Sequence, residues 1–432
     1  MRMEIRGINS EVERLVSEVP LPKMFQIRQR FPRVRIAPEN IYEEVQNCLR
    51  KCKATENIRP GMKIAITVGS RGITNLVHIT RAIVDFVKEK EASPFLIPAM
   101  GSHGGATAQG QKEILTSYGI TEEAMGCPIR SSMEVVKVGK NAEGTDVYID
   151  RYAYEADGII LNCRIKPHTS FRGPYESGIM KMMAIGLGKQ YGAEKCHEEG
   201  FQNMAKNIVL FGKTILERLN IICASAVIEN AYEETSKIVV LAPDEIENKE
   251  PLYLKEAFRN LPQIPVDFCD VLIVDKIGKN YSGDGMDPNI TGTFCTPYAS
   301  GGIKAQRVVV LDLSEETHGN AMGVGMASVT TQRLVEKMDL SAMYPNAITA
   351  SVLLGVRIPM IMKNDKQAIQ VCIKSCTGID KKFPRVVRIS NTLEMEYLWM
   401  SEAYYEEMRG KKEIQILNKP CEMEFDENGF LR

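Results

Sequence analysis

The sequence predicts an α/β fold built as two α/β domains with parallel sheets, and three observations support this. Apolar runs of strand length, each followed by a polar loop, occur at residues 63–68, 94–99 and 158–165. A segment with helical spacing of apolar residues separates the first two. The chain has 432 residues, more than the roughly 250–300 at which one hydrophobic core stops growing, so two domains are expected.

The first predicted strand and helix follow from apolar patterning. Residues 63–68, KIAITV, form a short apolar run bounded by loops. Residues 75–90 then carry apolar side chains at the spacing of one helix face, namely Leu76, Ile79, Ile83 and Phe86. A strand followed by such a helix is typical of the start of a parallel α/β sheet.

Two further strands continue this pattern. The run 94–99, PFLIPA, leads into a glycine-rich loop, after which Thr107 is suited to cap the N-terminus of a helix. The run 158–165, GIILNCRI, is a third strand that also ends in a polar loop. Alternation of strands and helices at this spacing predicts a parallel sheet with helical connections.

Each of these three strands is followed by a residue capable of chemistry. Arg71, His103 and His168 lie in the three loops, and ligands of open α/β sheets bind at the carboxyl ends of the strands. Neutral imidazole takes and returns a proton near pH 7, so His103 and His168 are candidate catalytic acid/base groups. For either histidine alone, the alternative is a solvated surface side chain.

The boundary between the domains is expected in a stretch rich in Pro, Glu and Asn, residues 243–265, which is typical of a linker. It divides the chain into an N-terminal catalytic domain, 1–265, and a C-terminal domain, 266–432. Ligand sites are frequent in the cleft between two domains. An interdomain cleft is therefore part of the predicted architecture.

The C-terminal domain is also predicted to be α/β. Strands are expected at 269–278 and 306–313, and a further strand at 386–389. A helix is expected near 400–408. The last elements of the chain are compatible with packing on either domain.

Composition excludes several classes of function. The chain has 54 Lys and Arg against 55 Asp and Glu, a net charge of −1, so it has no general attraction to nucleic acid or anionic membranes. It has no apolar run of about 18 residues and no apolar secretion signal near its start. Its 11 cysteines are scattered and odd in number, which favours free thiols in a reducing cytoplasm.

Two segments are candidates for binding a cofactor. In the loop after the second strand, Gly101, Gly104 and Gly105 let backbone N–H groups approach a phosphate, and the helix that begins at Thr107 adds its positive end. Lys181 is the single charge in the apolar run 179–187. Its side chain either reaches solvent along the apolar surface or lies in a desolvated site, where lysine becomes a nucleophile.

These residues together resemble the nickel-dependent lactate racemase family. That family carries the motif G-[ST]-H-R-P-x-T after a strand, and this chain has GSHGGAT at 101–107, with Gly104-Gly105 in place of Arg-Pro. A second motif contains Pro-His, a glycine, a lysine and a histidine sixteen residues after the lysine. Pro167-His168, Gly173, Lys181 and His197 occupy those positions.

The resemblance implies a specific cofactor and reaction. The cofactor is pyridinium-3-thioamide-5-thiocarboxylic acid mononucleotide, the nickel-pincer nucleotide, made and loaded with nickel by partner proteins. Lys181 would hold it covalently, His197 would bind nickel, and Arg71 would bind the substrate carboxylate. With His103 and His168 exchanging protons, the implied reaction is racemisation or epimerisation of a small 2-hydroxy acid by hydride transfer to the cofactor.

The C-terminal domain departs from the family in its substrate-binding segment. A Tyr-Gln pair and a lysine are replaced here by GMDPNITG at 285–292. Asn289 and Thr291 suit hydroxyl groups, so a 2-hydroxy acid more polar than lactate, bound across the interdomain cleft from the histidines, is expected. The alternative is a tight turn whose polar side chains cap the next segment.

Two other functions stay open from the sequence alone. His103, His168 and His197 could surround a different metal, zinc or iron, in another type of enzyme. The chain could also be a non-catalytic binding protein for an anionic metabolite. Arg71 and the loop 101–107 would then form the anion cradle.

Replacing Arg71 with Lys should weaken binding of the substrate carboxylate, because an ammonium group does not reproduce the two-pronged hydrogen bonding of guanidinium. We expect kcat/KM to fall by an amount equivalent to roughly 1.5–3 kcal/mol. Steady-state kinetics on the identified substrate checks this. Unchanged KM and kcat would remove Arg71 from the site.

Overall fold

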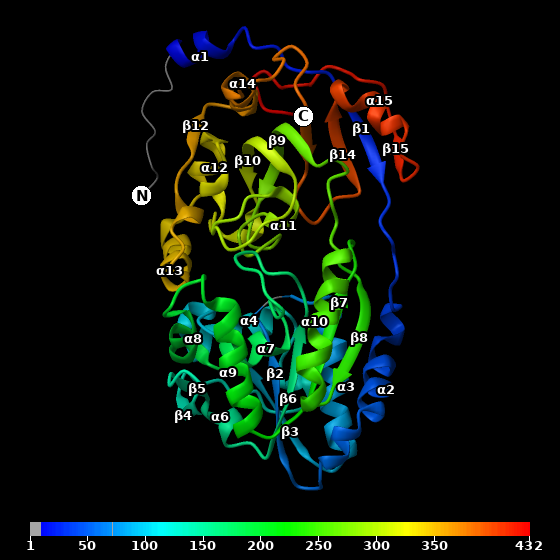
Figure 1. The fold of residues 1–432 in the computed structure, drawn as a ribbon, viewed down its shortest axis with the longest axis vertical. Helices are drawn as coiled ribbons and strands as arrows, with labels where there is room; N and C mark the ends of the chain where they lie inside the picture. Colours follow the sequence, from blue (N-terminus) through cyan, green and yellow to red (C-terminus); the bar gives the residue numbers. More distant parts are fainter. Residues whose placement is uncertain (1–9, 71) are drawn as a thin grey trace. The chain divides into compact units, whose positions relative to one another are not determined.

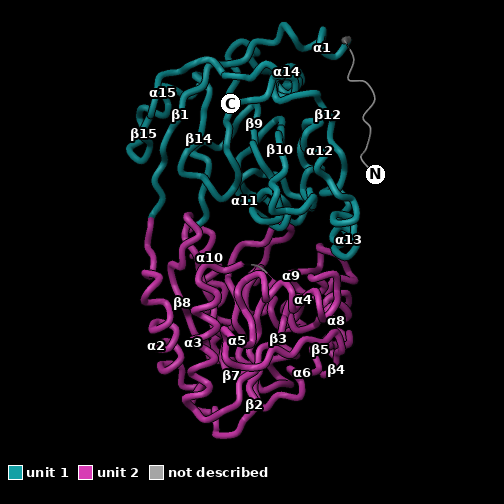
Figure 2. The backbone as a smooth tube through the Cα atoms, turned by 180° about the vertical axis from the view of Figure 1, so that it is seen from behind, with its two compact units in different colours: residues 1–32, 261–432 teal, residues 33–260 magenta. Residues whose placement is uncertain are grey.

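The structure, a computed structural model, describes residues 10–70 and 72–432. The chain forms two compact units (Figures 1 and 2). Unit 2 is residues 33–260, and unit 1 combines residues up to 32 with residues 261–432. Each unit contains helices and a sheet with parallel strands, so the predicted α/β fold class is confirmed.

The main sheet of unit 2 has five strands in the order β3-β2-β6-β7-β8. The first four in this order are parallel, and β8 is antiparallel to β7. The strands are β2 (Lys63–Val68), β3 (Ser93–Pro98), β6 (Gly158–Arg164), β7 (Ile221–Glu229) and β8 (Thr235–Leu241), with a separate antiparallel pair, β4 (Val135–Lys140) and β5 (Asp146–Asp150). The three strands predicted to carry functional loops, β2, β3 and β6, are therefore adjacent.

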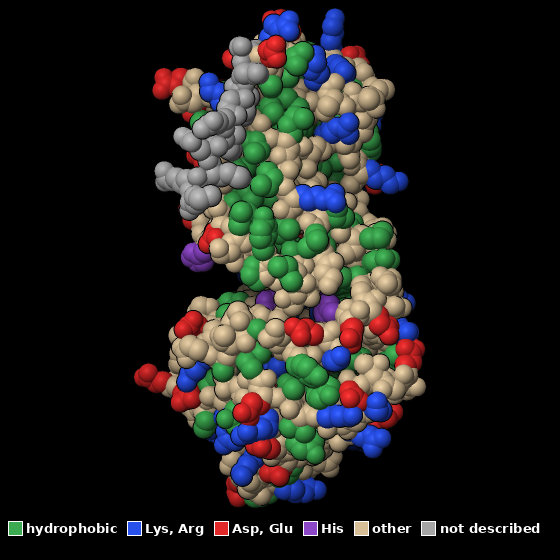
Figure 3. Space-filling view, turned by 90° about the vertical axis from the view of Figure 1, so that its left-hand side faces the viewer, with side chains coloured by type: hydrophobic (Ala, Val, Ile, Leu, Met, Phe, Trp, Pro, Cys, Tyr) green, Lys and Arg blue, Asp and Glu red, His purple; other side chains and the backbone are tan. Residues whose placement is uncertain are grey.

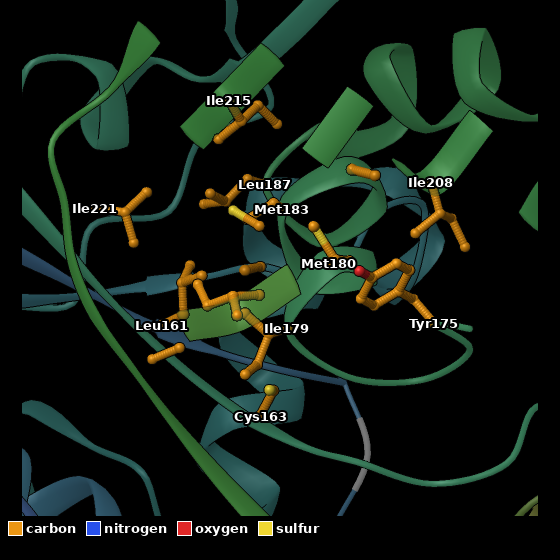
Figure 4. Packing of buried hydrophobic residues seen from close by; sticks show 14 of the residues in the cluster. Leu161, Cys163, Tyr175, Ile179, Met180, Met183, Leu187, Ile208, Ile215 and Ile221 are labelled. Atoms are coloured by element: carbon orange, nitrogen blue, oxygen red, sulfur yellow. The ribbon is translucent and has the colours of Figure 1, made fainter. Parts of the chain in front are cut away.

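Neighbouring residues of a strand point to opposite faces of the sheet. Both faces of this sheet therefore carry apolar side chains, and helices cover both. Ala65 of β2 belongs to one buried cluster, and Ile64 belongs to another, together with Ile83 of α3. The first cluster contains Ile208 of α9 and is seen in Figure 4. The helices of unit 2 are α2 (Ile41–Lys51), α3 (Leu76–Glu89), α4 (Ala108–Ser117), α5 (Glu122–Met125), α6 (Arg151–Tyr154), α7 (Ile179–Lys181), α8 (Lys189–His197), α9 (Met204–Arg218) and α10 (Pro243–Arg259).

Unit 1 contains an eight-stranded mixed sheet in the order β12-β11-β10-β9-β13-β14-β1-β15. Its strands are β1 (Met24–Gln29), β9 (Phe268–Ile277), β10 (Lys304–Leu313), β11 (Val329–Thr331), β12 (Met360–Met362), β13 (Val386–Ile389), β14 (Tyr397–Ser401) and β15 (Ile414–Ile416). Its helices are α1 (Ser10–Val16), α11 (Pro288–Thr291), α12 (Gln332–Glu336), α13 (Leu340–Ala350), α14 (Asp365–Ser375) and α15 (Tyr405–Arg409).

The expected N-terminal domain, 1–265, is wrong for residues 10–32, which belong to unit 1. Strand β1 pairs antiparallel with β14 and β15, so it completes the sheet of unit 1. Phe25 and Ile27 are fully buried there, in a cluster with Leu398. The alternation of β1 predicts a strand, but only long-range pairing decides which sheet it joins. For the same reason β13 to β15 lie in the sheet of β9, in unit 1.

One local prediction was wrong, and another was displaced by two residues. The stretch 243–265 is not a linker over most of its length, because Pro243–Arg259 form helix α10. Pro243 occupies the first turn, where proline lacks no needed N–H, and Ile246 and Leu254 lie on the buried face. The helix expected near 400–408 is present as a 3₁₀ turn, Glu402–Tyr404, followed by α15, and it starts after Ser401 because β14 pairs with β1 and β13 up to that point.

The surface agrees with the near-neutral charge of the chain. Lys and Arg side chains are interspersed with Asp and Glu on the face shown in Figure 3. Within residues 10–70 and 72–432, no helix has the length and apolar character needed to cross a membrane. The 11 cysteines carry free thiols.

Candidate active site

Residues 177–187, which include Lys181, are the common contact of the three strand-end loops. After β6, Lys166 and Ser177 exchange backbone hydrogen bonds of 2.9 and 3.1 Å. After β3, the N–H of Gly101 donates to the carbonyl of Gly186 over 3.3 Å. After β2, a Cβ added to Gly69 would lie 3.4 Å from Cε of Met182. The loops expected to carry the functional residues therefore meet on one segment.

The Lys181 segment combines two kinds of helical turn. Helix α7 continues into a π-helical turn, Met182–Gly186, and such turns are frequent at functional sites. Ile179, Met180 and Met183 are buried in the core shown in Figure 4, whereas Lys181 is half-buried. Lys181 is thus neither fully exposed nor enclosed in the core.

Glu250 of α10 holds the beginning of this segment. Its carboxylate accepts hydrogen bonds from the N–H groups of Ile179, at 2.7 Å, and Met180, at 3.1 Å. These N–H groups have no partner within the helix, so the carboxylate caps it. Sequence reasoning missed Glu250 because it lay in the stretch taken for a linker. Its spacing of four residues from both Ile246 and Leu254 was the available signal.

The ring of His103 is held by the backbone of its own loop. Its Nδ1 lies 2.7 Å from the carbonyl oxygen of Met100, and a carbonyl only accepts, so in the neutral ring Nδ1 carries the proton. Nε2 is then the nitrogen with a lone pair. The side chain is exposed, which agrees with a position in a loop beyond the sheet.

The glycines of this loop explain its departure from the family motif. Gly104 and Gly105 have φ values of +67° and +63°, which proline cannot adopt and which strain other side chains. A Cβ at Gly104 would lie 2.6 Å from the backbone of Gly110 and Gln111. The loop therefore packs against α4 in a conformation that Arg-Pro would not reach.

Thr107 caps helix α4, as predicted. Its Oγ1 accepts from the N–H of Gly110 over 3.0 Å and donates to the carbonyl of Gly104 over 3.0 Å. The hydroxyl thus shapes the glycine loop. Contact of Gly101, Gly104, Gly105 and Thr107 with a cofactor stays a prediction.

The neutral ring of His168 has the opposite tautomer. Its Nδ1 accepts from the N–H of Ser170 over 3.0 Å, so its proton lies on Nε2. The N–H of His168 itself donates to Oε2 of Glu176 over 2.7 Å. Glu176 is 2% exposed and also accepts from Arg172 and Gly173, so it orders the whole loop. Sequence reasoning missed this role.

Phe201 connects His168 to His197. Its ring centroid lies 6.2 Å from that of His168 and 5.5 Å from that of His197. Burial, followed by the charge of Lys181, lowers the pKa of His197 to about 4. The lysine and the histidine of the second motif are therefore close enough to interact, and His197 is neutral at pH 7.

A neutral imidazole is the form that binds a metal. In the part of the chain that the structure describes, no group of three or more His, Cys, Asp or Glu side chains could hold a metal ion. The alternative in which His103, His168 and His197 surround zinc or iron therefore gains no support. One histidine beside one lysine fits a metal whose other ligands come from a cofactor.

Arg71 lies outside the described residues, but its neighbours are anchored. The hydroxyl of Tyr118 donates to the carbonyl of Ser70 over 2.8 Å. The N–H of Thr74 donates to Glu229 over 3.0 Å, and Glu229 also pairs with Arg164 at the end of β6. Both ends of the loop after β2 are thus held near the carboxyl edge of the sheet.

Asn289 and Thr291 lie in a buried turn. They belong to unit 1 and are 8% and 1% exposed. The amide of Asn289 donates to Asp287 over 2.8 Å, and the hydroxyl of Thr291 bonds to Asp287 and Thr293. Asp287 is the N-cap of the short helix α11. The capping turn is therefore present, and binding of substrate by Asn289 and Thr291 stays a prediction.

Burial raises the pKa of Glu250 from 4.5 to about 7, which makes stability depend on pH. This contribution is complete below pH 4.5 and is lost as the pH rises through 7. Relative to Glu250→Gln, the wild type should lose on the order of 3 kcal/mol of unfolding free energy between pH 4.5 and 8. The nearby groups Cys163 and Tyr175 have raised pKa values and do not titrate in this range.

Urea unfolding at several pH values measures this difference. Glu247→Gln is the matched control, because Glu247 lies on the same helix and is paired with Lys213 at the surface. A difference between wild type and Glu250→Gln that does not vary with pH would contradict the assignment.

Comparison with known proteins gives the same family as the motifs. Residues 16–209 match the lactate racemase N-terminal domain. The lactate racemase apoprotein from Thermoanaerobacterium thermosaccharolyticum has a similar fold, with 14% identity and a TM-score of 0.51 over 81% of this chain and 90% of that one. A Thermotoga maritima protein of known crystal structure gives 15% identity and a TM-score of 0.48 over 65% of this chain and 72% of that one.

No curated protein sequence matches this chain. The resemblance predicted from the motifs is nevertheless confirmed by the domain match and by the fold. Over residues 16–209, this chain is therefore similar to the lactate racemase N-terminal domain.

Proposed function

We propose that this protein is a racemase or epimerase of a small 2-hydroxy acid that works with the nickel-pincer nucleotide. The observation that carries the proposal is the convergence of the loops after β2, β3 and β6 on the Lys181 segment. The residues that match the family motifs are distant in sequence, yet their loops meet at one edge of the sheet. Such an edge is where open α/β sheets bind ligands.

Lys181 and His197 would hold the cofactor. Lys181 would bind it covalently, and neutral His197 would be the protein ligand to nickel. This donor set fits a metal that receives its remaining ligands from the nucleotide. When bound, the cofactor would supply the acceptor for the hydride that leaves the substrate carbon.

The two histidines have distinct roles in proton transfer. His103 would accept the hydroxyl proton at Nε2, and the imidazolium that forms would still donate from Nδ1 to Met100. His168 presents Nε2–H to the substrate oxygen from the other side; to return a proton while His103 takes one, it would enter the cycle as imidazolium, with the Ser170 N–H hydrogen bond to Nδ1 given up. Strands β3 and β6 flank β2, so these loops start about 10 Å apart, which leaves room for a small acid.

Protein from the native host should carry a covalent adduct on Lys181. Intact-mass measurement and peptide mapping should find it in the wild type and in Lys213→Ala, where a half-buried lysine of α9 is removed, but not in Lys181→Ala. An unmodified Lys181 in protein that racemises a 2-hydroxy acid would overturn the cofactor assignment. A protein with neither adduct nor activity would favour the anion-binding alternative.

His103→Ala and His168→Ala should each reduce inversion by a factor of roughly 100 or more, the usual contribution of a general acid or base. Both residues lie in loops, so circular dichroism and thermal unfolding should change little. Polarimetry of the cofactor-loaded enzyme measures inversion. His78→Ala, an exposed position on α3, is the control. Near-normal rates in both loop variants would exclude this pair.

A further inference from the structure

A fully buried lysine lies eight residues after Lys181. Lys189 is 0% exposed, and its Nζ lies 3.0 Å from Oδ2 of Asp150, whose side chain is also 0% exposed. Nζ also donates to the carbonyl of Pro98 over 2.5 Å and to Oε1 of Gln111 over 3.0 Å. Three acceptors match the three hydrogens of an ammonium group.

Gln111 extends this network to the loop of His103. It lies on α4 and is 0% exposed. Its Nε2 donates to the carbonyl of Gly101 over 2.9 Å and to the carbonyl of His103 over 3.2 Å. An ion pair between Asp150 on β5 and Lys189 is thus followed by hydrogen bonds from Lys189 to Gln111 and from Gln111 to the backbone of His103.

Stability alone does not account for this network. Burial disfavours both charges, because it lowers the pKa of Lys189 and raises that of Asp150. Replacing such a pair with apolar groups of similar volume is often neutral or stabilising. Lys189 also has a φ of +53°, which is uncommon for residues other than glycine. These features point to a role in fixing the geometry of the groups that the network contacts.

We propose that Lys189 and Gln111 are positioning residues that fix the backbone of His103 relative to the Lys181 segment. The loop of His103 is tied to this segment twice, by the Gly101–Gly186 hydrogen bond and by Gln111 through Lys189. The backbone of this loop determines where the carbonyl oxygen of Met100 lies, and that oxygen accepts the hydrogen bond from the imidazole of His103. The inference rests on the proposed function only for the catalytic role of His103, because the positioning itself is a property of the apoprotein.

The test replaces Gln111 with Met, which keeps the length of the side chain and removes its hydrogen bonds. Gln109→Met is the matched control, because Gln109 lies on the exposed side of the same helix. The readout is the ring ¹⁵N spectrum of the apoprotein, in which the chain has only 5 histidines and His103→Asn assigns the signal. Wild type and Gln109→Met should show His103 with Nδ1 protonated. Gln111→Met should show a mixture of tautomers and a shifted titration midpoint.

A second variant covers the outcome in which Gln111→Met does not fold. Lys189→Met combined with Asp150→Leu removes both buried charges together, and we expect it to fold and to change the His103 signal in the same direction. A wild-type His103 signal in the folded variants would overturn the proposal. Failure of both variants to fold would also overturn it, because the network would then be required for folding.

Kinetics separates positioning from the proposed function. In the cofactor-loaded enzyme, Gln111→Met should lower kcat on the order of 100-fold, as a small misplacement of a catalytic group does, with KM changed less than about threefold. Gln109→Met should behave as wild type. If Gln111→Met changes the His103 signal but the wild type has no racemase activity, positioning is supported and the proposed function is rejected. If the wild type is active but Gln111→Met leaves the His103 signal unchanged, the proposed function is supported and positioning is rejected.

Discussion

The close approach of residues 177–187 to the ends of the neighbouring strands is the constraint on which the site depends. Gly186 makes this approach possible, because a Cβ there would lie 2.8 Å from the carbonyl oxygen of Ala99. With no side chain in the way, the loop after β3 bonds to the segment through Gly101. Loops are otherwise the most mobile parts of a fold. Packing three of them on one buried segment gives their side chains defined relative positions.

Buried polar side chains also fix the positions of the loops that the glycine contact brings together. Glu250 caps the segment, Glu176 orders the loop of His168, and Lys189 with Asp150 supports the loop of His103 through Gln111. A buried charge without partners is strongly destabilising, so each of these groups is tolerated because backbone groups or an opposite charge surround it. All of them act on the backbone next to the functional residues. The charged residues of this core therefore determine loop geometry.

The loop of His103 differs from the family motif but retains the histidine. Gly104 and Gly105 replace the Arg-Pro of the family motif, and their positive φ values let the loop pack on the N-terminus of α4. The histidine still follows β3, and Thr107 caps α4. The arginine that the family motif has after the histidine is absent, so an anionic group would be bound there without that positive charge. In unit 1, Asn289 and Thr291 support a turn.

The sequence by itself determined the local elements and the chemical candidates. The apolar runs that became β2 and β6, the helical spacing of α3 and the cap at Thr107 depend on interactions within a few residues, which a local pattern contains. The two motifs likewise carry their spacing in the sequence. The tertiary structure decided the rest. The pairing of β1 with β14, the contact of Glu250 with the start of α7, and the burial of Lys189 against Asp150 and Pro98 join residues far apart in the chain. No local pattern specifies such partners, because burial and pairing follow from the topology of the whole sheet.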